Sequence, residues 1–123
     1  MRQVRSENTN PELIVRRITY ALGFRYRLHQ KELPGKPDLV FTKKRKVIFV
    51  HGCFWHGHQC KRGSRLPKTN RDYWRNKLQG NIERDKRNAQ ALTEKGWSVL
   101  TIWECDLKDQ HALAEKLNNF LSP

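Results

Sequence analysis

The ten residues from 51 to 60, HGCFWHGHQC, concentrate metal-binding and ionisable side chains in one short stretch. Within it, Cys53, His58 and Cys60 have the spacing C-x4-H-x-C. Thiolate sulfur and neutral imidazole nitrogen are the ligands of tetrahedral structural zinc sites. Cys105 is the only other cysteine in the chain and could supply the fourth ligand. These residues therefore predict one closed zinc site that joins position 105 to the segment.

Two carboxylates and two further histidines could carry hydrolytic chemistry. Asp38 and Glu12 each follow a proline, and Mg²⁺ prefers oxygen ligands such as carboxylates and carbonyls. Imidazole changes protonation near neutral pH, so His51 or His56 could accept a proton from water or interact with a phosphate. Both carboxylates also have ordinary structural explanations. Glu12 stands three residues after Thr9, as in a capping box, and aspartate is a common turn residue.

The chain is strongly basic, with 25 Lys and Arg against 12 Asp and Glu and a formal net charge of +13. Such a balance favours a polyanionic partner, and nucleic acid is the partner that we expect. A solvated basic surface would have the same composition, so no single Lys or Arg is assigned to DNA. Nucleic acid is favoured because many basic residues occur beside an aromatic-rich metal segment.

Apolar spacing and turn residues predict elements in the order α-β-β-β-α-β-α. Asn70 is the expected cap of the long helix, and Gly23 and Gly96 are expected to end the first and second helices. At 123 residues the chain is expected to form one domain, residues 1–123, with an α/β fold in which helices flank a mixed sheet. The expected elements cover residues 10–22, 24–28, 38–41, 47–50, 70–95, 97–103 and 112–120.

No apolar run approaches the roughly 20 residues that span a bilayer, and the N-terminus lacks the apolar core of a signal peptide. We therefore expect a cytoplasmic protein with no membrane partner. Thiols stay reduced in the cytoplasm, where clustered Cys and His bind metal more often than they form disulfides.

Four motifs, in order, resemble a known family. A Pro-Asp pair ending in Asp38, with a hairpin partner that ends in Phe-Val-His at 49–51, is similar to the PD-(D/E)xK nuclease superfamily, with the acidic-x-Lys element replaced by Phe-x-His. That replacement, the Cys/His segment, NIERD at 81–85 and WEC at 103–105 resemble the very-short-patch repair (Vsr) endonucleases, DNA mismatch nickases of bacteria. The resemblance covers nearly the whole chain, from residue 1 to about 107.

The resemblance implies a restriction-endonuclease-like fold and Mg²⁺-dependent hydrolysis of one phosphodiester on the 5′ side of the T in a T:G mismatch, which leaves a 5′-phosphate. Asp38 and the main-chain carbonyl of Val50, where the family usually has threonine, would bind Mg²⁺, with two ions expected. His56 would activate the attacking water. His51 would polarise or protonate the phosphate, and Glu12 would hold a metal-bound water or orient His56.

The same resemblance gives the four zinc ligands a structural role and makes Phe54, Trp55 and Trp74 an aromatic wedge that enters the duplex beside the mismatch. Insertion costs less at a mispaired step because that step is already easier to unstack. From spacing alone, Trp74 would suit a core position. Asp85 could form a surface ion pair on its helix, so the sequence assigns it no role.

The implied partners are double-stranded DNA with a T:G mismatch and, as a functional link, a cytosine-5 DNA methyltransferase, because deamination of 5-methylcytosine creates such mismatches. A monomer bound to the bacterial nucleoid is expected, since nicking one strand needs one active site. Family members carry further residues before the position of Met1, so the N-terminal arm is expected to be short or truncated. Two alternatives stay open: a superfamily DNA nuclease without mismatch preference, and a zinc-stabilised DNA-binding module without turnover.

Overall fold

The computed structural model describes residues 10–28, 30–54, 56 and 68–122. Its helices and strands follow the predicted order, with one short 3₁₀ helix, η1, added before the last α-helix. The elements are α1 (Asn10–Ala21), β1 (Arg27–Leu28), β2 (Leu39–Phe41), β3 (Lys46–His51), α2 (Arg71–Glu94), β4 (Ser98–Trp103), η1 (Glu104–Lys108) and α3 (Gln110–Leu121).

The four strands form one mixed sheet in the order β1-β2-β3-β4. β1, β2 and β3 are antiparallel neighbours, whereas β3 and β4 run parallel, from the pair Lys46 and Ser98 to the pair His51 and Trp103. Parallel neighbours need a crossover connection, and α2 provides it. This mixed sheet with flanking helices fits the expected restriction-endonuclease-like fold.

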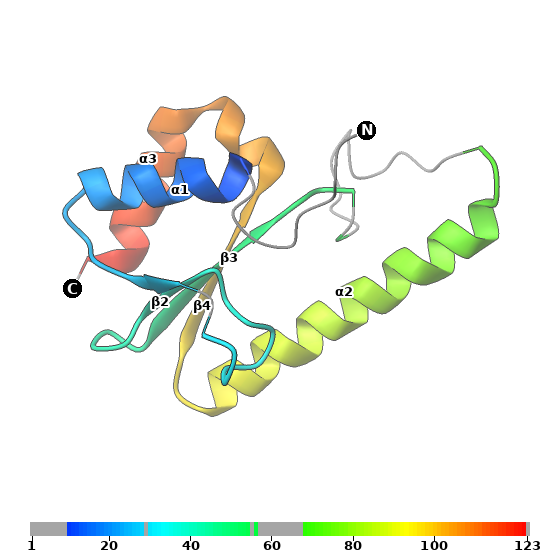
Figure 1. Cartoon of the computed structure of the whole chain (residues 1–123), viewed down its shortest axis with the longest axis horizontal. Helices are drawn as coiled ribbons and strands as arrows, with labels where there is room; N and C mark the ends of the chain where they lie inside the picture. Colours follow the sequence, from blue (N-terminus) through cyan, green and yellow to red (C-terminus); the bar gives the residue numbers. More distant parts are fainter. Residues whose placement is uncertain (1–9, 29, 55, 57–67, 123) are drawn as a thin grey trace.

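Helices cover both faces of the sheet (Figure 1): α1 and α3 lie together on one face, and α2 crosses the other. Strand side chains alternate between the two faces, so β2 and β3 contribute to two separate clusters. Leu39 and Ile48 belong to the cluster with α1 and α3, and Val40 and Val47 to the cluster with Leu92 of α2. These strands are buried on both sides, which explains their continuous apolar runs.

The C-terminal part of α2 packs on the sheet, whereas its N-terminal part extends well beyond it (Figure 1). α2 has 24 residues and is largely polar, with Leu78 and Leu92 as its buried residues. Within the described ranges, no helix is both long enough and apolar enough to cross a membrane.

Two local predictions were wrong in detail. The strand expected over residues 24–28 forms ladder pairs only at Arg27 and Leu28, while Tyr26 packs partly buried against the core. Asn70 does precede α2, but it has a left-handed backbone (φ 59°) and its side chain makes no capping hydrogen bond. Gly96, with φ 91°, ends the α2 region as predicted.

Candidate active site

The backbone hairpin fixes Asp38 beside the end of β3. The N–H of Asp38 donates to the carbonyl of Ile48 at 3.0 Å, which extends the β2-β3 pairing by one bond. The N–H of Val50 then donates to Oδ2 of Asp38 at 2.6 Å. The carboxylate of Asp38 and the backbone of Val50 are therefore neighbours, and Mg²⁺ binding by the two stays a prediction.

Glu12 reaches the same place from α1. It is buried, with 2% of its surface exposed, and it shares a side-chain hydrogen bond with Asp38. Arg16, one helical turn later, donates from Nη2 to Oε2 of Glu12. Thr9 lies outside the described residues, so the capping-box alternative stays a prediction.

The electrostatics of this carboxylate pair favour a cation. The pKa of Asp38 is raised from 3.8 to about 7. Burial is the largest cause, and the charge of Glu12 and its hydrogen bond with Asp38 raise the pKa as well, whereas the N–H of Val50 and the charge of Arg16 lower it. Two carboxylates with one guanidinium leave a negative centre in a poorly hydrated place. Carboxylate and carbonyl oxygens are the ligands that Mg²⁺ prefers, so the oxygens of Asp38 and Val50, with the carboxylate of Glu12 close behind, fit this ion.

His51 and His56 stack face to face, with ring centroids 3.8 Å apart and an interplanar angle of 5°. His51, at the end of β3, is largely enclosed, and its Nδ1 atom is buried with no hydrogen-bond partner among the described residues. The pKa of His51 is lowered from 6.5 to about 4, mainly by burial and then by the charge of His56, while the charge of Asp85 acts in the opposite direction. The indole of Trp103 lies edge-on to His51 at 5.3 Å and closes one side of the pair.

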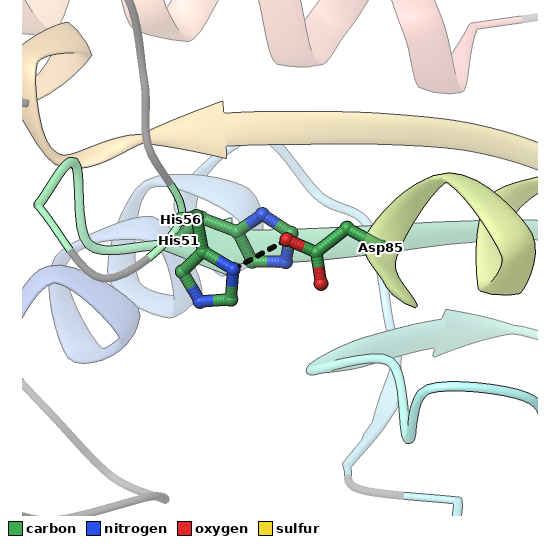
Figure 2. Close-up of side chains that lie close together, drawn as sticks. All are labelled: His51, His56 and Asp85. Carbon is green, nitrogen blue, oxygen red and sulfur yellow. Dashed lines mark hydrogen bonds and ion pairs between the residues drawn. The ribbon is translucent and has the colours of Figure 1, made fainter. Parts of the chain in front are cut away.

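Asp85 on α2 completes this group. Its Oδ2 atom lies 2.6 Å from Nδ1 of His56 (Figure 2), and Arg84 lies 3.6 Å from its other oxygen. A carboxylate can only accept, so Nδ1–H of His56 donates and the lone pair lies on Nε2. From the sequence alone, Asp85 has no assigned role. The only available signal was its place in the NIERD motif.

The ligand atoms of His51, His56 and Asp85 all lie within 4.8 Å of one another. This spacing suits either proton transfer or a metal ion, and imidazole nitrogen favours ions such as zinc, copper or nickel over magnesium. The site therefore has an oxygen donor set around Asp38 and a nitrogen-rich set around His56.

Both sets open into one cavity of about 990 Å³. Asp38, Val50, His51, His56 and Asp85 all line it, whereas Glu12 is not among its lining residues and lies buried behind Asp38. Basic side chains from the loop before β2, from α2 and from its C-terminal end line the same cavity: Lys31, Lys36, Arg84, Lys86 and Lys95. The cavity thus combines candidate acid–base groups with a wall suited to an anionic substrate.

Two of the four predicted zinc ligands meet. Cys53 is buried, and its Sγ accepts the backbone N–H of Cys105 at 3.4 Å. The loop after β3 and η1 are thereby brought together. His58 and Cys60 lie outside the described residues, so the zinc site stays a prediction.

Two of the three predicted wedge residues also meet. Phe54 and Trp74 make an edge contact with centroids 5.7 Å apart, and Tyr73 makes an edge contact with Trp74 with centroids 5.3 Å apart. Trp74 is only partly buried and is not part of the core. Trp55 lies outside the described residues.

Comparison with known proteins is consistent with this geometry. Residues 1–62 match the family described as DNA mismatch endonuclease Vsr. The chain is 52% identical to the type II nicking enzyme V.XorIIP of Xanthomonas oryzae over 123 residues, which cover all of this chain and 90% of that protein. It is 43% identical to the type II nicking enzyme V.NmeAIP of Neisseria meningitidis over 98% of this chain and 86% of that protein. It is 38% identical to the DNA mismatch endonuclease Vsr of Escherichia coli over 94% of this chain and 74% of that protein. The chain therefore belongs to the Vsr family of DNA endonucleases.

Proposed function

We propose that this protein nicks one strand of duplex DNA by hydrolysing the phosphodiester on the 5′ side of the T in a T:G mismatch, leaving a 5′-phosphate. The observation that carries the proposal is that Asp38 and His56, from different parts of the chain, line one cavity with a basic wall. A Mg²⁺-binding carboxylate and a base for water are what phosphodiester hydrolysis requires.

Asp38 and the carbonyl of Val50 would hold Mg²⁺, with Glu12 behind Asp38. Bound there, Mg²⁺ would offset the negative charge that develops on the phosphate oxygens. The protein fixes its own groups beforehand, because the N–H of Val50 holds Asp38 at 2.6 Å and Arg16 holds Glu12. Such fixed geometry lowers the barrier, because little reorganisation is left for the reaction itself.

His56 would take the proton from the attacking water. With Nδ1–H directed at Asp85, the free Nε2 is the accepting atom, and the carboxylate stabilises the imidazolium that forms. His51, stacked on His56 and enclosed by Trp103, would contact the phosphate. The stacking also limits the orientations open to His56, which keeps Nε2 pointed in one direction.

Substrate choice would come from the wedge and the basic wall. Phe54 and Trp74 form a contiguous aromatic edge beside the loop that carries His56, and a mispaired step yields to such an edge more easily than a matched step. Two relatives are named nicking enzymes and a third is named a mismatch endonuclease, which supports a single-strand product and mismatch recognition. A cytosine-5 methyltransferase would be the functional partner.

A strand-resolved nicking assay tests the proposal. Duplexes with a T:G mismatch in several methylation-site contexts, and matched duplexes of the same sequence, are labelled separately on each strand and incubated with Mg²⁺. We expect nicks in the T strand of the mismatched duplex only, a 5′-phosphate at the nick, and none with Asp38→Asn. Equal cutting of the matched duplex would instead support a nuclease without mismatch preference, and binding without cutting would support a DNA-binding module.

A further inference from the structure

Arg16 of α1 makes an ion pair with Glu12 that is largely buried, unlike an ordinary ion pair on a helix surface. Nη2 of Arg16 donates to Oε2 of Glu12 across one turn of α1. The side chain of Arg16 is 14% exposed and that of Glu12 is 2% exposed. The charge of Arg16 also acts on Asp38, which shares a hydrogen bond with Glu12. One guanidinium and two carboxylates therefore share a largely enclosed space.

Helix stability does not account for this arrangement. An exposed Glu–Arg pair at this spacing contributes only about 0.3–0.5 kcal/mol, and burial of both charges adds a desolvation cost that can exceed their attraction. The burial becomes understandable when Asp38 is included, because among the described residues Arg16 is the positive charge that acts on both neighbouring carboxylates.

We infer that Arg16 is a positioning residue of the magnesium site, which holds Glu12 by one carboxylate oxygen and keeps it from becoming a direct ligand of the ion. This inference rests on the proposed function. With Oε2 held by Arg16, Glu12 presents its other oxygen to Asp38 and to water near the phosphate. Asp38 is then left as the carboxylate that binds Mg²⁺ directly.

The inference predicts opposite effects on metal binding and on turnover. Arg16→Gln removes a positive charge beside the carboxylates and frees Glu12 to bind Mg²⁺ directly. We therefore expect the Mg²⁺ concentration at half-saturation to fall about fivefold to tenfold, because the local potential becomes more negative. The nicking rate at saturating Mg²⁺ should fall about tenfold to a hundredfold, because Glu12 is no longer held in place. Substitution of a residue with a merely structural role would weaken both Mg²⁺ binding and nicking, or would change neither of them.

Metal binding is measured without DNA, from the Mg²⁺-dependent rise in thermal unfolding temperature of the full chain, and nicking is measured on the T:G duplex. Arg17→Gln is the matched control, since Arg17 lies on the same helix, is exposed and loses the same charge. Its Mg²⁺ midpoint should equal that of the wild type within about twofold, because the charge of an exposed side chain is screened by water and salt. Arg16→Lys keeps the charge but not the planar fork, so it should restore the wild-type midpoint.

An unchanged or raised Mg²⁺ midpoint in Arg16→Gln, a shift of equal size in Arg17→Gln, or a wild-type protein that Mg²⁺ does not stabilise would overturn the inference. If Arg16→Gln does not fold, the Arg16→Lys variant decides. A wild-type Mg²⁺ midpoint with a reduced nicking rate supports the inference, and a wild-type nicking rate overturns it. A wild-type protein that binds Mg²⁺ but nicks no duplex would contradict the proposed function alone, because the midpoints are measured without DNA.

Discussion

Nδ1 of His56 and Oδ2 of Asp85 lie 2.6 Å apart although 29 residues separate them in the chain. One residue comes from the loop after β3 and the other from the middle of α2, so the fold, not local sequence, makes the contact. The hydrogen bond fixes both the tautomer and the orientation of the imidazole. In this protein Asp85 therefore belongs to the candidate active site, in addition to its ion pair with Arg84 on the same helix.

Asp85→Asn should lower the nicking rate by about tenfold to a hundredfold, because an amide can stabilise the wrong tautomer of His56 and cannot stabilise its charged form. Single-turnover nicking of the T:G duplex measures this rate. Asp72→Asn is the matched control, because Asp72 lies on the same helix with 95% of its side chain exposed. Similar rates for the two variants would show that Asp85 has no part in the reaction.

Asp38→Asn should stabilise the magnesium-free protein at alkaline pH. Burial and the neighbouring Glu12 raise the folded-state pKa of Asp38 from 3.8 to about 7, so its contribution to stability is full below pH 3.8 and is lost as the pH rises through 7. Asparagine does not ionise. At pH 8 the variant should be more stable by on the order of 1–3 kcal/mol, and the difference should shrink towards pH 4.

Urea unfolding between pH 4 and pH 8 in magnesium-free buffer measures this difference. His51 acts in the opposite direction, because its pKa is lowered from 6.5 to about 4 and its contribution is present above pH 6.5 and lost as the pH falls towards 4. In Asp38→Asn, stability should therefore rise with pH over this range. A variant that is less stable than the wild type at pH 8 would refute this account of the carboxylate pair.

His58→Asn should remove the predicted zinc ion. Cys53 and Cys105 already meet, and His58 and Cys60 would complete the ligand set. Loss of a structural zinc ion costs several kcal/mol, so the unfolding temperature should fall by roughly 10 °C or more. Zinc per chain is measured by elemental analysis. His111→Asn, an exposed histidine on α3, should keep its zinc; a wild-type protein without zinc, or equal loss in both variants, would contradict the site.

Trp74→Ala should reduce the preference for mismatched DNA. The indole forms one edge with Phe54, and stacking of an aromatic ring on a base contributes about 1–3 kcal/mol, so the ratio of T:G to matched nicking rates should fall about tenfold. Tyr20→Ala, which removes an exposed aromatic ring from α1, serves as the control. If Trp74→Ala slows both duplexes by the same factor, Trp74 supports the loop and does not recognise the mismatch.

The sheet was largely predictable because β2 and β3 are apolar on both faces, a pattern that composition alone reveals. The alternation of apolar and basic residues at 24–28 correctly predicted that Tyr26 is partly buried. It did not predict which residues pair with a neighbouring strand, and only Arg27 and Leu28 pair with β2. Asn70 has a residue type that favours capping, yet its positive φ directs the side chain away from that role.

The site was only partly predictable. Asp38 and His51 stand at strand ends, so local patterns place them at the same end of the β2-β3 hairpin. Asp85 could not be placed, because α2 is polar on most of its surface and its rotation about its own axis depends on the packing of Leu92 against the sheet. Arg16 could not be singled out from the sequence either. Its importance comes from the burial of Glu12, and the spacing of Glu12 and Arg16 does not reveal that burial.

The central claim is that Asp38 and His56 act on the same phosphodiester bond. A double-mutant cycle with Asp38→Asn and His56→Gln, measured by single-turnover nicking of the T:G duplex, tests it directly. Groups that act as one unit are strongly non-additive, so we expect each single variant to lose at least about a hundredfold and the double variant to be no slower than the slower single variant. Losses that multiply in the double variant would show that the two residues act independently and would contradict the claim.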